Sequence, residues 1–199
     1  MLVSLESIAI SRNALIHLCC LCLTAVGCAS NTGSSPLFGV EEARLPAADA
    51  AAIENFFSTW FQLDADGRLI YPGCGPIDPV PDVLDLNGDG EYEAFVRWGN
   101  TCTSGMAGST LSLFIKGPTG EYQHELGFPA GGYRALTTGD GYPDLEIGLP
   151  GFCFPVWSWS GATYEYACSL PQPGGSCPSE LRLCDDASQE IIDGKKIRP

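Results

Sequence analysis

Apolar residues recur with helical spacing in the segment before residue 62. Five of them fall at i, i+3, i+4, i+7 and i+8, which is one face of an amphipathic helix. They are Ile53, Phe56, Phe57, Trp60 and Phe61. Pro46 suits the first turn of such a helix, and the polar stretch DADG at 64–67 ends it. We interpret the aromatic stripe as the core-facing side of the helix rather than as a binding groove.

The pattern changes to short strands after residue 69. Aromatic and branched residues at 93–98, at 109–126 around a Gly-Pro-Thr-Gly turn, and at 144–150 are typical of strands. Residues 155–167 have the pattern of a hairpin with a Ser-Gly-Ala turn. These signals predict an α+β fold, in which the N-terminal helix packs on one small antiparallel sheet.

The two ends of the chain differ from this central part. Residues 14–27 form an apolar run that is shorter than the roughly 20 residues of a membrane-spanning helix, so residues 1–27 are predicted to be a secretory signal. We expect a single folded domain at 45–168. Residues 169–199 are predicted to be a Pro/Gly-rich, cysteine-containing tail.

The stretch LTAVGC, which ends at Cys28, resembles a bacterial lipoprotein cleavage box. The resemblance implies that Cys28 becomes the lipidated first residue of the mature chain, followed by a polar, flexible tether at 28–44. Ala29 would then imply anchoring to the outer membrane of a Gram-negative bacterium, on the periplasmic side or at the cell surface. The alternative is an ordinary cleaved signal with an incidental cysteine.

Cysteine content agrees with export. The chain has 10 cysteines, of which three leave with the signal and Cys28 would carry the lipid. An even number remains, which in an exported chain indicates disulfides. Several pairings are possible, and we expect neighbours to pair. The expected pairs are Cys74–Cys102, Cys153–Cys168 and Cys177–Cys184. A metal cluster is the rival interpretation, but the mature part lacks a CxxC pair.

Charge excludes two classes of partner. The net charge is −14, from 24 acidic and 10 basic residues. Nucleic-acid binding requires a basic surface, and attraction to anionic lipid does too. An acidic balance instead suits solubility, cation binding or a basic protein partner.

One loop concentrates this negative charge. In DLNGDGEYE at 85–93, oxygen-bearing side chains alternate, and glycines stand where the chain must turn sharply. A tight loop can curl such oxygens around one Ca²⁺ ion, which takes about six to eight oxygen ligands. The candidate metal ligands are Asp85, Asn87, Asp89, Glu91 through its backbone carbonyl, and Glu93. The alternative is a solvated acidic turn without an ion.

The loop is not an EF-hand, because Val96 occupies the position of the bidentate glutamate and a strand follows. It resembles the calcium loop of FG-GAP and VCBS-type repeats, which links β-strands. That resemblance implies a single structural Ca²⁺ site and degenerate loop–strand units. Weaker copies of the Asp/Gly pattern of this loop, here called echoes, occur at 63–67 and 137–151. The stretch 141–167 also resembles a group of exported bacterial proteins without an assigned activity.

No catalytic motif emerges. The mature part contains one histidine, His124, which we interpret as a surface residue, and no G-x-S-x-G elbow is present. Two acids can suffice for a glycosidase, so Asp140, Asp144 and Glu146 are the candidates for a hydrolase. We favour a structural role for them.

The sequence therefore predicts a non-enzymatic lipoprotein of the cell envelope that binds a protein or glycan partner. The expected contact surface is the aromatic hairpin, with Trp157, Trp159, Tyr164 and Tyr166. The alternatives are a glycan-active hydrolase, an inhibitor or immunity-like factor against a basic enzyme, and a purely structural envelope component.

Overall fold

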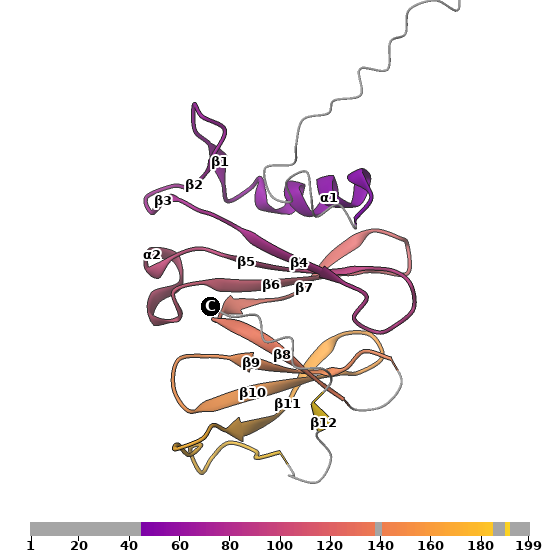
Figure 1. Ribbon diagram of the computed structural model, residues 1–199, viewed down its shortest axis with the longest axis vertical. Helices are drawn as coiled ribbons and strands as arrows, with labels where there is room; N and C mark the ends of the chain where they lie inside the picture. Colours follow the sequence, from indigo (N-terminus) through magenta and orange to yellow (C-terminus); the bar gives the residue numbers. More distant parts are fainter. Residues whose placement is uncertain (1–44, 138–140, 185–189, 192–199) are drawn as a thin grey trace, which may run out of the picture. The chain divides into compact units, whose positions relative to one another are not determined.

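The computed structural model of the chain describes residues 45–137, 141–184 and 190–191 (Figure 1). The expected signal peptide, Cys28 and the tether at 28–44 lie outside the described residues. The described part is mostly β, with three small antiparallel sheets and two short helices. The β content confirms the predicted antiparallel strands, but they do not form one sheet.

Helix α1, Ala47–Phe57, confirms the predicted N-terminal helix. It begins after Pro46, whose backbone φ of −53° suits a helix start, and Ser58 closes it with a hydrogen bond from its backbone N–H to the carbonyl of Glu54. Trp60 and Phe61 follow the helix in a turn, because both of their backbone N–H groups bond to the carbonyl of Phe57. The helical spacing thus extends beyond the helix itself.

A three-stranded sheet follows, in which strand order equals chain order. Its strands are β1 (Gln62–Leu63), β2 (Leu69–Tyr71) and β3 (Gly75–Pro76). The DADG stretch forms the turn between β1 and β2, where the N–H of Gly67 bonds to the carbonyl of Asp64 at 3.0 Å. This stretch therefore starts a hairpin beside α1 as well as ending the helical region.

The next four strands form a meander in the order β4-β5-β6-β7. They are β4 (Val80–Leu84), β5 (Glu93–Trp98), β6 (Thr110–Lys116) and β7 (Tyr122–Pro129). Helix α2 (Thr101–Ser104) and a 3₁₀ turn (Gly105–Ala107) connect β5 to β6. The side chain of Asn100 caps α2 by accepting the N–H groups of Cys102 and Thr103.

The remaining strands form a separate sheet in the order β11-β10-β9-β8-β12. They are β8 (Gly132–Thr137), β9 (Asp144–Gly148), β10 (Cys153–Trp159), β11 (Tyr164–Pro171) and β12 (Glu190–Ile191). The expectation of one sheet was wrong at this point, since β8 pairs with β9 and not with β7. Strands buried on both faces, as β5 and β6 are, require a covering layer on each side.

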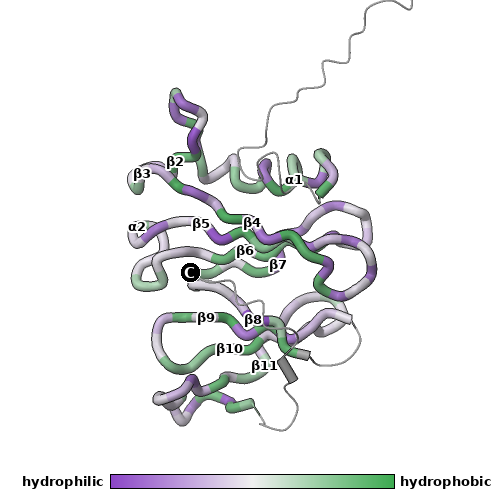
Figure 2. Tube along the Cα trace, in the orientation of Figure 1, coloured by the Kyte–Doolittle hydropathy of each residue, from purple (hydrophilic) through white to green (hydrophobic). Residues whose placement is uncertain are grey.

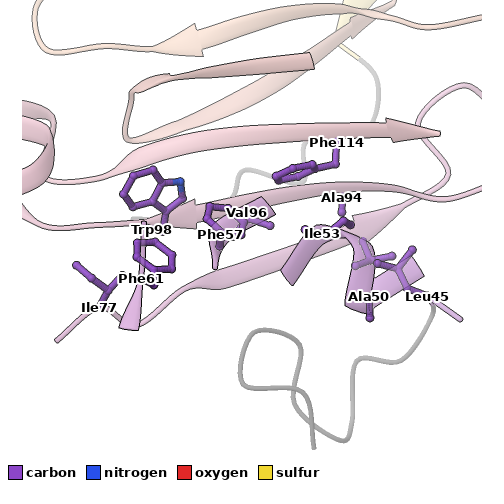
Figure 3. Close-up of a cluster of buried hydrophobic side chains, with 11 residues drawn as sticks. Leu45, Ala50, Ile53, Phe57, Phe61, Ile77, Ala94, Val96, Trp98 and Phe114 are labelled. Carbon is purple, nitrogen blue, oxygen red and sulfur yellow. The ribbon is translucent and has the colours of Figure 1, made fainter. Parts of the chain in front are cut away.

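The first core lies between α1 and one face of the four-stranded sheet. Ile53 and Phe57 of α1 pack against Val96 and Trp98 of β5 and Phe114 of β6 (Figure 3). Phe57 makes edge-to-face ring contacts with Phe114 at 5.6 Å and with Trp98 at 5.9 Å. The helix is thus held mainly by aromatic packing.

The second core joins the four-stranded and five-stranded sheets. Phe95 and Leu113 from the former cluster with Leu145 and Ile147 from the latter. The ring of Phe95 stacks on Tyr133 of β8 at 3.5 Å. Figure 2 shows the hydrophobic residues along β6 and β9 that supply this layer.

Three disulfides brace the described part. Cys74 pairs with Cys102, as expected. The other two expected pairs are corrected, because Cys153 bonds to Cys177 and Cys168 bonds to Cys184. In the β10–β11 register, Cys168 lies opposite Val156, three residues from Cys153. That offset is about 10 Å, beyond the roughly 7 Å that a disulfide can bridge.

The two corrected disulfides also show how the C-terminal segment is attached to the fold. Strand β11 runs through residue 168, the expected domain boundary. Both disulfides then attach the following segment to the five-stranded sheet, and the N–H of Ser169 bonds to the carbonyl of Arg182 at 2.7 Å. Residues 172–184 are therefore part of the fold rather than an independent tail. Three disulfides also indicate an oxidising, extracytoplasmic environment.

Candidate functional site

The acidic loop at 85–92 connects β4 to β5 and is organised around the carboxylate of Asp85. One oxygen of Asp85 accepts the backbone N–H groups of Gly88 at 2.7 Å and Asp89 at 3.1 Å. The other oxygen accepts the N–H of Gly90 at 3.0 Å. Gly88 and Gly90 have φ of 78° and 90°, a conformation that favours glycine. The loop therefore wraps its backbone dipoles around one negative charge.

Asn87 and Asp89 extend this network. The amide oxygen of Asn87 accepts the N–H of Asp89 at 3.1 Å, and its amide nitrogen donates to the Asp89 carboxylate at 2.8 Å. The second oxygen of Asp89 accepts the N–H of Glu91 at 2.8 Å. The structure thus links three of the predicted ligand residues within one loop. Apart from the Asp85 oxygen that accepts two N–H groups, each of these hydrogen-bonded oxygens retains a lone pair for a further ligand.

The side chain of Glu91 forms an ion pair with a lysine instead of joining this network. Lys116 of β6 contacts the Glu91 carboxylate at 2.8 Å and the Asp49 carboxylate of α1 at 3.2 Å. Both hydrogen bonds raise the pKa of Lys116 above its ordinary value, and the one to Glu91 has the larger effect. The prediction for Glu91 concerned its backbone carbonyl, which this ion pair does not engage.

The Glu93 side chain is buried and bonds both to the acidic loop and to the segment before β9. Its side chain is 1% exposed, and its carboxylate accepts the N–H of Leu86 at 2.7 Å and the hydroxyl of Tyr142 at 2.9 Å. Burial raises the pKa of this carboxyl above its usual range, although both hydrogen bonds act in the opposite direction. Glu93 thus ties the loop to the segment that precedes β9.

These contacts define what the loop could hold. Among the described residues, no group of three or more His, Cys, Asp and Glu side chains is arranged to hold a metal ion. An ion here would need mixed oxygen donors, which Ca²⁺ accepts: carboxylates of Asp85 and Asp89, the amide oxygen of Asn87, the carbonyl of Glu91, and water. The donor chemistry of these four residues fits Ca²⁺, and the predicted role of the buried Glu93 carboxylate as a further ligand stays a prediction.

The echo at 63–67 has a different electrostatic partner. Asp64 accepts the N–H groups of Asp66 and Arg68 at 2.9 Å each, and the Arg68 guanidinium bonds to its other oxygen at 2.8 Å. The backbone hydrogen bond from Arg68 is the main cause that lowers the pKa of Asp64. In this loop Arg68 forms ion pairs with the carboxylates of both Asp64 and Asp66. The ligand-bearing residues of the other echo lie partly outside the described residues.

The four aromatic residues of the expected contact surface do not form one exposed patch. Tyr164 is 4% exposed, and its hydroxyl donates to the carbonyl of Pro143 at 2.8 Å. Trp157 and Trp159 are half-buried and pack against the core between the sheets. Tyr166 is 44% exposed. The hairpin of β10 and β11 uses most of its aromatic surface to hold the two sheets together.

The candidate hydrolase residues differ in burial and in their contacts. Asp140 lies outside the described residues. Glu146 is 4% exposed, forms an ion pair with Arg134 and accepts the side-chain amide of Gln172 at 3.3 Å. Asp144 of β9 is half-buried. His124 stacks on Phe56 at 4.5 Å, and burial lowers the pKa of its imidazole.

Sequence reasoning missed a cavity beside α1. It has a volume of about 320 Å³ and lies between one face of the helix, with Ala51, Asn55 and Ser58, and the hairpin residues Leu63 and Leu69. The i, i+4, i+7 spacing of the helix residues was visible in the sequence. The position of the hairpin was not, because two short strands give no long-range signal.

Comparison with known proteins supplied no relative: the chain matches no protein-family model, no curated protein and no solved structure. The resemblance of the acidic loop to FG-GAP repeats therefore remains a prediction from its own residues. Within the described ranges, no helix is long and apolar enough to cross a membrane.

Proposed function

We propose that this protein is an exported, non-enzymatic binding module of the cell envelope, stabilised by one Ca²⁺ ion in the loop 85–93 and anchored by a lipid on Cys28. The observation that carries the proposal is the hydrogen-bonded loop itself, in which Asp85, Asn87 and Asp89 are linked on a disulfide-braced β domain. The disulfides support export. The sequence pattern supports the anchor.

The ion would neutralise the two carboxylates that the loop brings together. Asp85 and Asp89 would bind it through the oxygen atoms that each accept one backbone N–H group, from Gly90 and Glu91 respectively. Asn87 and the carbonyl of Glu91 would supply neutral donors. Glu93 would act beside the ion rather than on it, since its hydrogen bonds to Leu86 and Tyr142 hold the loop against the second core.

Calcium should raise the melting temperature of the full chain. At a free concentration about 100 times the dissociation constant, binding to the folded state alone adds about 2.7 kcal/mol, a shift of roughly 5–10 °C. The measurement is thermal unfolding in excess Ca²⁺ and in a chelator. Asp89→Asn keeps the size of the side chain but removes its charge, so the calcium-dependent shift should shrink by more than half.

Asp66→Asn is the matched control, because Asp66 lies in the β1–β2 turn and is largely exposed. This variant should keep the whole calcium-dependent shift. Equal melting temperatures of the unsubstituted chain in calcium and in chelator would refute the ion site.

The partner-binding part of the proposal rests on the exposed side chain of Tyr166 in β11, the outer strand next to β10. Tyr166 is the most exposed of the four aromatic residues expected there, and its ring contacts Trp157 at 6.4 Å. Aromatic rings with one exposed face can stack on sugar rings or on apolar side chains of a protein. We therefore assign the contact surface to Tyr166 and the neighbouring edge of Trp157.

A glycan partner should change tryptophan fluorescence without being cleaved. The experiment is a titration of the full chain with a panel of polysaccharides, together with an assay for released reducing ends. Tyr166→Ala should weaken the binding of a responding glycan about fivefold, because a stacked aromatic contributes on the order of 1 kcal/mol. Its melting temperature should change little, since the ring is exposed. Release of reducing ends that is lost in Glu146→Gln would support the hydrolase alternative instead.

A further inference from the structure

The acidic loop contains an asparagine directly followed by a glycine, Asn87 and Gly88. The chain has five asparagines, and the other four precede larger residues. The backbone nitrogen of the residue after an asparagine can attack the side-chain carbonyl carbon, and a glycine permits that approach because it has no Cβ. Gly88 is exposed, so water reaches the dipeptide. Asn87 is therefore the asparagine of this chain at which such a reaction is least hindered.

The reaction is a deamidation, and its atoms balance with solvent water as the co-reactant. The nitrogen of Gly88 bonds to Cγ of Asn87, the Cγ–Nδ2 bond breaks, and the amide proton of Gly88 leaves with Nδ2 as ammonia. Water then adds to one carbonyl of the resulting succinimide ring and breaks that carbon's bond to nitrogen. The product at position 87 is an aspartate or an isoaspartate, so the loop gains a negative charge.

Hydrogen bonds engage both reacting groups in the folded loop. The N–H of Gly88 donates to the Asp85 carboxylate at 2.7 Å, whose negative charge opposes loss of the amide proton. The Asn87 side chain is bound to Asp89, since its oxygen accepts the backbone N–H at 3.1 Å and its nitrogen donates to the carboxylate at 2.8 Å. Ring closure consumes two of these donors, the Gly88 N–H and the Asn87 Nδ2. The folded loop thus stabilises the reactant and not the transition state.

We propose that Asn87 is a deamidation site, that the folded loop slows its reaction, and that the product destabilises the loop. A carboxylate at position 87 cannot donate to Asp89, and it adds a like charge where the amide nitrogen lies 2.8 Å from the Asp89 carboxylate. Isoaspartate also lengthens the backbone within a loop that Asp85 holds through three N–H groups. This inference goes beyond the proposed function and depends neither on calcium nor on the lipid.

The first test follows the full chain, with its disulfides intact, by peptide mapping after incubation in chelator at mildly alkaline pH. Conversion at Asn87 should be at least about ten times slower in the folded chain than in urea. In urea, Asn87 should react faster than Asn55 and Asn100, which precede bulkier residues. Equal rates at Asn87 with and without urea, or a faster reaction at either other asparagine in urea, would overturn the proposal.

Asp66→Asn supplies a matched comparison within one chain. It places a second asparagine before a glycine, Gly67, whose φ of 77° is close to that of Gly88. The side chain at position 66 is 80% exposed, and the N–H of Gly67 donates to the carbonyl of Asp64 rather than to a carboxylate. Position 66 should therefore react several times faster than Asn87 in the folded chain, whereas the two should react alike in urea. Equal rates at both positions in the folded chain would contradict the assigned restraint.

The effect of the product on the loop has its own pair of variants. Asn87→Asp introduces the charge, whereas Asn87→Ala removes the donor to Asp89 without adding one. In chelator, both variants should melt below the unsubstituted chain, and Asn87→Asp should melt roughly 2–4 °C below Asn87→Ala because of charge repulsion. An Asn87→Asp chain that melts at or above the temperature of Asn87→Ala would show that deamidation does not destabilise the loop as proposed.

Discussion

Glu93→Ala should lower the free energy of unfolding by about 3–5 kcal/mol, because it leaves two buried donors unpaired and opens a void. The carboxylate accepts the N–H of Leu86 and the hydroxyl of Tyr142, and the side chain is almost completely buried. Both the acidic loop and the junction of the two sheets depend on it. Urea-induced unfolding in chelator measures the change without a contribution from calcium.

Two controls separate the lost hydrogen bonds from a general packing defect. Glu93→Gln can still accept from Leu86 and donate to the Tyr142 hydroxyl, so its cost should be within about 1–2 kcal/mol. Tyr142→Phe removes one of the two donors. Its loss in free energy of unfolding should lie between those of the two Glu93 variants or close to that of Glu93→Gln. If Glu93→Ala costs less than Glu93→Gln, the assigned hydrogen bonds are wrong.

The same residue predicts a pH dependence. Burial raises the pKa of the Glu93 carboxyl in the folded state above its value of 4.5 in the unfolded chain. Between these two pKa values the folded state binds more protons than the unfolded state, so stability contributed by Glu93 is complete below pH 4.5 and is lost as the pH rises through the folded-state pKa. Glu93→Gln should lack this component when unfolding in chelator is followed across that window.

Loss of the Cys168–Cys184 disulfide should cost about 3 kcal/mol, the value expected for a closed loop of about 15 residues. The bond has a sequence separation of 16 and attaches the C-terminal segment to β11. Cys168→Ser combined with Cys184→Ser should also make residues 178–184 sensitive to protease, because the remaining Cys153–Cys177 bond ends before them. Urea unfolding and limited proteolysis measure the two effects.

Cys74→Ser combined with Cys102→Ser is the comparison variant. It opens a loop with a sequence separation of 28 elsewhere in the fold, so it should reduce stability by a similar amount but leave residues 178–184 protected. Peptide mapping of the unreduced chain tests the pairing directly. Recovery of a Cys153–Cys168 peptide would contradict the structure.

Local patterns in the sequence predicted the elements that depend on neighbouring residues. The apolar spacing around Ile53 predicted α1, and the Gly-Pro-Thr-Gly turn predicted the β6–β7 hairpin, in which the N–H of Gly120 bonds to the carbonyl of Gly117. The alternation of Asp85, Asn87 and Asp89 predicted a compact acidic loop. Each of these depends on contacts within a few residues, where sequence spacing and spatial distance are closely related.

Long-range arrangement could not be obtained in the same way. Glu93 has the residue type of a loop ligand, but its carboxylate faces Tyr142, 49 positions away. Trp157 looked like a surface aromatic, but it stacks on Phe128 of another sheet at 5.4 Å. Which face of a strand is covered depends on the sheet that packs against it, and residue type alone does not specify that sheet.

By itself, the sequence determined the helix, the strand-rich body, the acidic turn and an even set of cysteines after the predicted export signal. The tertiary structure decided that the strands separate into three sheets, that β10–β11 register keeps Cys153 and Cys168 apart, and that a cavity lies beside α1. The reason is physical: helix periodicity and turn chemistry are local, whereas strand pairing and core packing are chosen by the free energy of the whole assembled chain.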